Sequence, residues 1–323
     1  MAGMKLVPAD GPILRQILHE SHGIWCDGLT PHAYGQFNAA QLKTPWGSRN
    51  LRRFALLDKE DRLLTSAKRY RLRIRVDGRV LDAVGIGAVF TPEPERRKGY
   101  APIIIERLID DAKVHGAEIA VLFTEIGTEY YERLGFEAVP LHQVLLEVAE
   151  KPGAPMVLVR AAEDRDVPAV TALATSMMAE HRFAVVPDHD SIRFSLTKKR
   201  LLAGLSTPGA LVVEFFIVEE GAGAVAFVIL TTAGDDVVLE MCGDRDPSGA
   251  RVGAMLQVLR ARTPGESAVK IRGSLPRGWM PPQLNAVAKA KSPDVLMVRP
   301  LKDGVLARPL KEEDVLYWHG DLF

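Results

Sequence analysis

Glu95-Arg96-Arg97-Lys98-Gly99-Tyr100-Ala101 connects a predicted strand to a predicted helix, and the predicted architecture of the chain rests on this connection. Residues 83–91 before it are apolar and rich in β-branched side chains, which is typical of a buried strand. After it, apolar residues between 103 and 112 recur at helical spacing, with charged residues between them. A glycine turn at a helix start presents free backbone N–H groups and the positive end of the helix dipole. With three basic side chains at its mouth, this turn predicts a binding site for a phosphate-like anion.

The spacing Arg96-x-x-Gly99-x-Ala101 resembles the (Gln/Arg)-x-x-Gly-x-(Gly/Ala) signature of the GCN5-related N-acetyltransferase (GNAT) superfamily. Residues 118–123 predict the next strand, and the following Tyr-Tyr-Glu-Arg-Leu-Gly-Phe at 130–136 is similar to the superfamily's (Phe/Tyr)-Tyr-x-x-x-Gly-Phe segment. The chain departs from the common pattern at Glu93, where the superfamily usually has a proline. The resemblance implies an α/β fold, with a central mixed, mostly antiparallel sheet flanked by helices, and an acyl-CoA-dependent enzyme that acylates an amine.

The resemblance also implies where acetyl-CoA, as co-substrate, would bind. In the superfamily the strand before the turn separates from its neighbour at a bulge, and the pantetheine arm pairs with the strand's backbone. Gly85 and Gly87 fit such a bulge, although they could instead make room for a bulky neighbour such as Trp25 or Phe123. The cofactor-binding residues implied in this way are Val89, Phe90, Thr91, Arg96, Arg97, Lys98, Gly99, Tyr100, Ala101 and Thr124.

Tyr131 stands where the superfamily has its general acid. A phenol with a reference pKa of about 10 suits the protonation of a departing thiolate, whereas the alternative role for Tyr131 is packing alone. The sequence identifies no general base. Asp82, Glu125, His32 and His142 are candidates, and each could equally be structural.

Two further features allow two interpretations each. Arg69, Arg71, Arg73 and Arg75 alternate with apolar residues, which places all four on one face of a strand. They could bind an acidic partner or form a solvated face paired with carboxylates across the sheet. Aromatic residues between 25 and 46 could shape an acceptor pocket or form a small core of their own.

The 323 residues are long enough for two domains, and the pattern of predicted elements repeats after a Pro- and Gly-rich segment. We therefore predict two tandem GNAT-like domains: residues 1–150 as the active domain, 151–155 as a linker and 156–300 as a degenerate second copy. Residues 141–148 are expected to complete the first sheet, and 295–300 to end the second. In the second copy the turn region carries Asp244 and Asp246, which would repel a pyrophosphate.

The tail, residues 301–323, ends in an aromatic segment that we expect to dock on the body of the protein. The chain resembles the enhanced-intracellular-survival acetyltransferases, in which tandem domains occur and the C-terminal carboxylate serves as the base. That resemblance implies a catalytic role for the carboxylate of Phe323. The alternative is a tail that packs on its own domain.

Forty-one basic residues balance forty-one acidic ones, so the composition argues against binding to nucleic acid or an anionic membrane. Two cysteines are too few for a disulfide framework or a thiolate metal site, and no metal is expected. No signal segment or bilayer-spanning run is visible, which predicts a cytoplasmic protein, monomeric or a small homo-oligomer.

We therefore predict an acetyl-CoA-dependent N-acyltransferase that acetylates a primary amine, of a small molecule, by direct attack on the thioester. A non-catalytic acyl-CoA-binding regulatory module and a protein lysine acetyltransferase are the alternatives.

Overall fold

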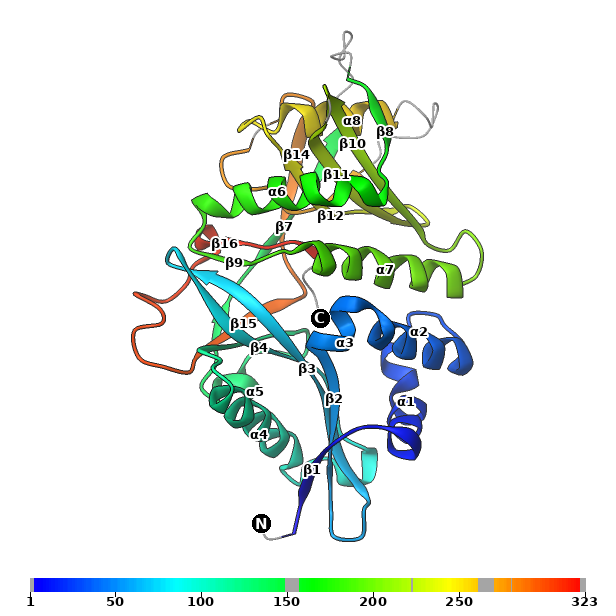
Figure 1. The fold of residues 1–323 in the computed structure, drawn as a ribbon, viewed down its shortest axis with the longest axis vertical. Helices are drawn as coiled ribbons and strands as arrows, with labels where there is room; N and C mark the ends of the chain where they lie inside the picture. The colour runs from blue at the N-terminus through cyan, green and yellow to red at the C-terminus, as the bar shows by residue number, and fades with distance from the viewer. Residues whose placement is uncertain (1–2, 149–156, 222, 261–269, 280, 320–323) are drawn as a thin grey trace.

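The computed structural model describes residues 3–148, 157–221, 223–260, 270–279 and 281–319, which form two β-sheets stacked along the long axis of the molecule (Figure 1). Within the described residues the first sheet has nine strands in the order β1-β2-β3-β4-β5-β15-β6, with β9 on β3 and β16 on β9. These strands are β1 (Lys5–Pro8), β2 (Leu51–Leu57), β3 (Leu63–Val76), β4 (Arg79–Phe90), β5 (Ile119–Thr124), β6 (Glu137–Val139), β9 (Phe183–Val185), β15 (Val295–Pro300) and β16 (Val315–Leu316). Only β4–β5 and β9–β16 pair in parallel, so the sheet is mixed and mostly antiparallel, as predicted.

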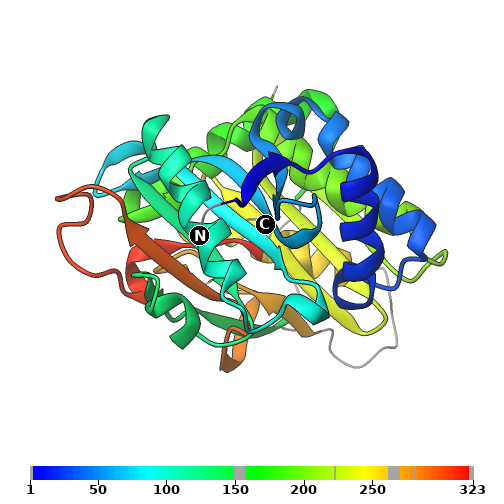
Figure 2. The same ribbon diagram turned by 90° about the horizontal axis from the view of Figure 1, so that it is seen from below.

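Helices cover both faces of the first sheet (Figure 2). One face carries α1 (Gly11–Trp25), α2 (Pro31–Lys43) and α3 (Pro45–Asn50), and the other carries α4 (Tyr100–Val114), while the short α5 (Glu129–Glu132) follows β5. Helix α4 lies flat on the sheet because Ile104, Ile105, Leu108 and Ile109 form one apolar stripe that is fully buried.

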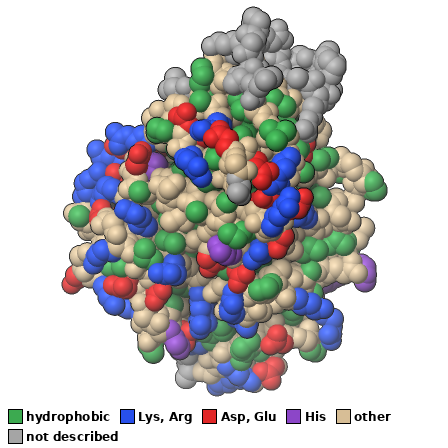
Figure 3. Space-filling model, turned by 45° about the horizontal axis from the view of Figure 1, so that its top comes forward, with side chains coloured by type: hydrophobic (Ala, Val, Ile, Leu, Met, Phe, Trp, Pro, Cys, Tyr) green, Lys and Arg blue, Asp and Glu red, His purple; other side chains and the backbone are tan. Residues whose placement is uncertain are grey.

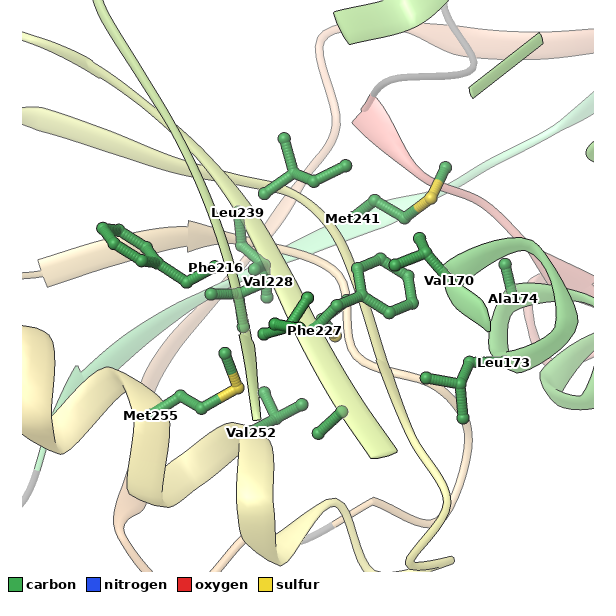
Figure 4. Close-up of a cluster of buried hydrophobic side chains, with 14 of the residues drawn as sticks. Val170, Leu173, Ala174, Phe216, Phe227, Val228, Leu239, Met241, Val252 and Met255 are labelled. Atoms are coloured by element: carbon green, nitrogen blue, oxygen red, sulfur yellow. The ribbon is translucent and has the colours of Figure 1, made fainter. Parts of the chain in front are cut away.

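The second sheet has seven strands among the described residues, in the order β14-β7-β13-β12-β11-β10-β8. They are β7 (His142–Val148), β8 (Val159–Ala161), β10 (Val212–Glu220), β11 (Gly223–Ala233), β12 (Asp236–Asp244), β13 (Lys270–Gly273) and β14 (Leu284–Lys291). Helices α6 (Val167–Met177) and α8 (Ala250–Arg260) pack on it, and Figure 4 shows their apolar side chains on either side of strand residues such as Phe227. The fold class, with two GNAT-like sheets flanked by helices, is confirmed.

Two strands join the sheet opposite to the one expected. β7 pairs with β13 and β14 in the second sheet, and β15 pairs with β5 and β6 in the first. The expectation that 141–148 completes the first sheet and 295–300 ends the second is therefore wrong. The physical reason is that an apolar strand pattern reports burial and not the identity of the neighbouring strand. Among the described residues the first half thus contributes β7 to the second sheet, and the second half contributes β9, β15 and β16 to the first. The linker at 151–155 lies outside the described residues.

Helix α7 (His189–Leu205) and the tail connect the two sheets. α7 runs between them, above α2 and α3 and below α6 in the view of Figure 1. In the tail, Tyr317 packs into the core of the first sheet and Trp318 into the core of the second. Phe323 lies outside the described residues, so the catalytic role of its carboxylate stays a prediction.

Charge is mixed over the surface: Figure 3 shows basic and acidic side chains interspersed on the face that it presents. The arginines of β3 follow the same pattern, because Arg69 pairs with Asp111 of α4 and Arg73 lies opposite Asp82 of β4. These contacts favour the interpretation of a paired, largely solvated face. Among the described residues no helix combines the length and apolar character needed to cross a membrane.

Candidate active site

Strand β4 is bulged and leaves its neighbour β5 at the point expected. Ser66 of β3 pairs with Phe90 of β4, whereas Lys68 pairs with Gly87, so β4 has an extra residue between the two pairs. Within this bulge Ala88 adopts a positive φ of 45°. On its other side β4 pairs with β5 only from Ala83 to Gly85. Beyond Gly85 the two strands separate, so the backbone of residues 86–90 is not paired with β5.

The predicted anion turn forms between β4 and α4. Arg97 and Gly99 have positive φ values of 64° and 83°, and α4 begins directly after Gly99 without a side-chain cap. A Cβ added to Gly99 would meet no atom within 4 Å, so glycine is required here for the backbone conformation and for an open approach. The Arg96 Nε donates to the Thr91 carbonyl at 3.2 Å and thereby braces the turn.

The basic side chains of the turn face solvent. Arg96, Arg97 and Lys98 are exposed, and the Lys98 ammonium lies 3.0 Å from the Glu95 carboxylate. The turn therefore presents uncapped N–H groups with cations around them, which fits the phosphates of a CoA-type group.

A cavity of about 350 Å³ lies between the bulged end of β4 and the end of β5. Its walls come from α1, α2, β2, β3, β4, β5, α5, α7 and the segment before β15. The lining residues are Trp25, Asp27, Tyr34, Phe37, Asn38, Gln41, Arg53, Lys68, Tyr70, Ile86, Gly87, Ala88, Val89, Phe123, Thr124, Glu125, Ile126, Tyr131, Lys198 and Asp294. The cavity thus brings together the predicted residues Val89, Thr124 and Tyr131 with groups from the second half of the chain.

Tyr131 is placed in this cavity by the short helix α5. Its side chain is buried and held by edge-to-face contacts with Tyr130, at 4.9 Å between ring centroids, and with Phe136. Burial raises the pKa of the Tyr131 phenol above its ordinary value, so the phenol is protonated at neutral pH. The structure therefore places a protonated phenol among the residues that line the cavity.

Two acidic residues, Glu125 and Asp294, also line this cavity. Burial raises the pKa of Glu125, and the Asp294 carboxylate raises it further through charge and a shared hydrogen bond. Thr124 just before it uses its hydroxyl locally, accepting from the N–H of Ile126 and donating to the Gly127 carbonyl, both at 3.3 Å. Thr124 thus stabilises the turn that presents Glu125.

Three of the four candidate bases lie elsewhere. His32 is exposed on α2, Asp82 lines a separate cavity with the β3 arginines, and His142 lies 3.0 Å from Glu312. Glu125 is the candidate base that the structure places in the cavity.

Sequence reasoning missed several charged residues of the cavity, namely Asp27, Arg53, Lys68, Lys198 and Asp294. A signal was present for two of them. Lys68 alternates in phase with Tyr70, Leu72 and Ile74, which are buried, so a lysine on this apolar side of β3 is out of place. Arg53 is similarly in phase with the buried Leu51 and Ala55 of β2.

The corresponding turn of the second half is already filled by the protein itself. The carboxylate of Asp244 accepts the N–H groups of Arg251, at 2.8 Å, and Val252, at 3.3 Å, at the start of α8. A Cβ on Gly249 would lie 2.4 Å from the ring of Trp279. This helix start has an internal anion and an aromatic cover, which leaves no place for a phosphate.

Comparison with known proteins identifies the superfamily. Residues 30–139 match the family model described as an acetyltransferase (GNAT) domain. Over these residues, about a third of its length, the chain is similar to a GNAT acetyltransferase domain.

The fold of this GNAT protein recurs in solved structures of low sequence identity. A GCN5-related N-acetyltransferase from Kribbella flavida is 15% identical, with a TM-score of 0.68 over 94% of this chain and 72% of that chain. A GCN5-related N-acetyltransferase from Anabaena variabilis is 11% identical, with a TM-score of 0.68 over 93% of this chain and 73% of that chain. Saccharomyces cerevisiae N-myristoyltransferase with bound myristoyl-CoA is 10% identical, with a TM-score of 0.54 over 93% of this chain and 83% of that chain. No curated protein sequence matches the chain.

Proposed function

We propose that this GNAT protein is an acetyl-CoA-dependent N-acetyltransferase that acetylates the primary amine of a small molecule. The observation that carries the proposal is the cavity in which the bulged backbone of β4 lies near the buried phenol of Tyr131, close to an uncapped anion turn.

The donor would be held by backbone groups. The N–H groups of residues 97–101 and the cations of the turn would bind the pyrophosphate. Residues Val89, Phe90 and Thr91 would pair with the pantetheine arm, because β4 has no β5 partner beyond Gly85. The Phe90 carbonyl already accepts from the Thr65 hydroxyl at 2.9 Å, which fixes this end of the strand.

The chemistry is direct acyl transfer. The amine nitrogen attacks the thioester carbonyl carbon, a C–N bond forms, and the C–S bond breaks. The Tyr131 phenol gives its proton to the leaving thiolate, and the nitrogen loses a proton to Glu125 or to water beside it. Backbone N–H groups at the bulge polarise the carbonyl during the attack.

A small acceptor is favoured by the small volume of the cavity. Helices α1 and α2 and the second-half residues Lys198 and Asp294 contribute to the lining of the cavity. A volume of about 350 Å³ is at the small end of the range for small-molecule pockets.

The test is thiol release from acetyl-CoA in the presence of a panel of primary amines, with product mass as a second readout. We expect at least one small amine to give stoichiometric free CoA and an acetylated product. Tight acetyl-CoA binding without thiol release across the panel would instead indicate a binding module, and acetylation confined to protein lysines would exclude a small-molecule acceptor.

A further inference from the structure

The guanidinium of Arg53 is buried in the wall of the cavity, and no carboxylate among the described residues forms an ion pair with it. The side chain is 6% exposed, and its Nη1 and Nη2 atoms have no hydrogen-bond partner among the described residues. Burial lowers the pKa of Arg53, and the neighbouring phenol groups of Tyr34 and Tyr70 offset this only in part. A buried charge without a partner is costly, so a ligand that completes it is favoured.

Arg53 is part of a cluster of cations on one face of the sheet. Lys68 lies directly opposite it on β3, and Gly87 lies opposite Lys68 on β4. Directly opposed side chains have Cβ atoms about 5 Å apart, and two like charges in such a pair repel. Lys198 of α7 lines the same part of the cavity.

The acidic groups of the cavity do not neutralise Arg53. Asp27 acts on Lys68 and Lys198, and burial and the neighbouring cations hold the pKa of Lys68 well below its ordinary range. Glu125 and Asp294 share a hydrogen bond with each other, and the charge of Asp27 also acts on Glu125. The cavity therefore contains a pair of carboxylates, Glu125 and Asp294, in addition to the basic side chains of Arg53 and its neighbours.

We propose that the acceptor is an amine that also carries a carboxylate, and that Arg53, assisted by Lys68, binds this carboxylate. The inference rests on the proposed acetyltransferase function and names its substrate class. A guanidinium matches a carboxylate with two parallel hydrogen bonds. The amine would then point toward Glu125, Asp294 and the bulge at Gly87.

The dimensions agree with a small amino acid. Arg53 lies on β2 and Gly87 on β4, and β3 runs between these two strands. The backbones of β2 and β4 are therefore about 10 Å apart. The side chain of Arg53 extends into the cavity and shortens the distance between its guanidinium and Gly87. The donor arm shares the cavity of about 350 Å³, which leaves space for one small acceptor.

The experiment compares amino acids with their methyl esters, and phosphoethanolamine with ethanolamine, at saturating acetyl-CoA. We expect kcat/KM for the best amino acid to exceed that for its ester at least tenfold in the natural protein. Arg53→Met should bring the ratio close to one, because kcat/KM for the amino acid should fall at least tenfold more than kcat/KM for the ester. Arg52→Gln is the control, because the neighbouring Arg52 is exposed and its Nη1 donates to the Leu51 carbonyl instead of lining the cavity.

Two further measurements separate this inference from the function on which it rests. If no amine is acetylated, calorimetry still tests the role of Arg53. N-acetyl amino acids and their methyl esters are titrated into the protein in the presence of CoA. The acids should bind more tightly than the esters, and Arg53→Met should lose this difference. The melting temperature of Arg53→Met should equal or exceed that of the natural protein, because an unpaired buried charge has been removed. Equal kcat/KM for acids and esters, a preference for phosphoethanolamine, or equal loss on both substrates in a folded Arg53→Met would overturn the proposal.

Discussion

Replacing Gly99 by leucine tests anion binding by the turn while changing the stability of the fold only slightly. Gly99 has a φ of 83°, and nothing lies within 4 Å of an added Cβ, so the variant meets a backbone penalty without a clash. For an L-residue in this region that penalty is about 1–2 kcal/mol of unfolding free energy. The side chain would project from the mouth of the helix and keep a phosphate from the N–H groups there.

Losing two charge-assisted hydrogen bonds of about 1.5–3 kcal/mol each corresponds to at least a hundredfold weaker binding of acetyl-CoA. The matched control is Gly116→Leu. Gly116 follows the other end of α4, with a φ of 98° and nothing within 4 Å, so the backbone penalty is similar and the anion turn is untouched. Calorimetric titration with acetyl-CoA and denaturant unfolding of both variants make the comparison. Unchanged binding by Gly99→Leu, or an equal loss in Gly116→Leu, would refute the assignment of the turn.

Three other predictions concern the acid, the second half and the tail. Tyr131→Phe should lower kcat by about 10²–10⁴-fold with acetyl-CoA affinity nearly intact, and a change confined to KM would show that Tyr131 only positions substrate. Calorimetry should give one acetyl-CoA per chain, because Asp244 occupies the helix start of the second half; two equivalents would contradict this. Although burial would raise the pKa of Glu240, His319 at 2.8 Å and Lys199 at 2.7 Å hold it near 2. Because that pKa is below the unfolded value, the pairing should contribute about 3 kcal/mol of stability above pH 4.5, lost as the pH falls toward 2. Glu240→Gln should therefore be less stable than the natural protein at pH 7 and nearly equal to it near pH 2, and an equal stability gap at both pH values would show that the pairing is not its source.

The donor side of the site could be predicted from sequence because it is local. The strand, the turn at Gly99, the start of α4 and the segment containing Tyr131 lie within about fifty consecutive residues, and each has its own pattern. The short connections between these elements are enough to bring them close together. The bulge at Gly87 could also be predicted, because glycines in a buried strand call for a structural reason.

The acceptor side could not be predicted because it is assembled from distant segments. Lys198 and Asp294 reach the cavity only through α7 and through the exchange of β15 into the first sheet, and no local pattern encodes either event. Arg53 and Lys68 were visible as charged residues in phase with buried neighbours. Their shared cavity depends on the register between β2 and β3, which the sequence does not determine.

A crystal structure of the protein with acetyl-CoA tests the central claim most directly. We expect a single molecule per chain, with its pyrophosphate on the N–H groups of residues 97–101 and its pantetheine arm along Val89–Thr91. The thioester should then lie in the cavity, with its sulfur within hydrogen-bonding distance of the Tyr131 hydroxyl. Acetyl-CoA bound at Asp244–Arg251, or a thioester directed away from Tyr131, would contradict the account.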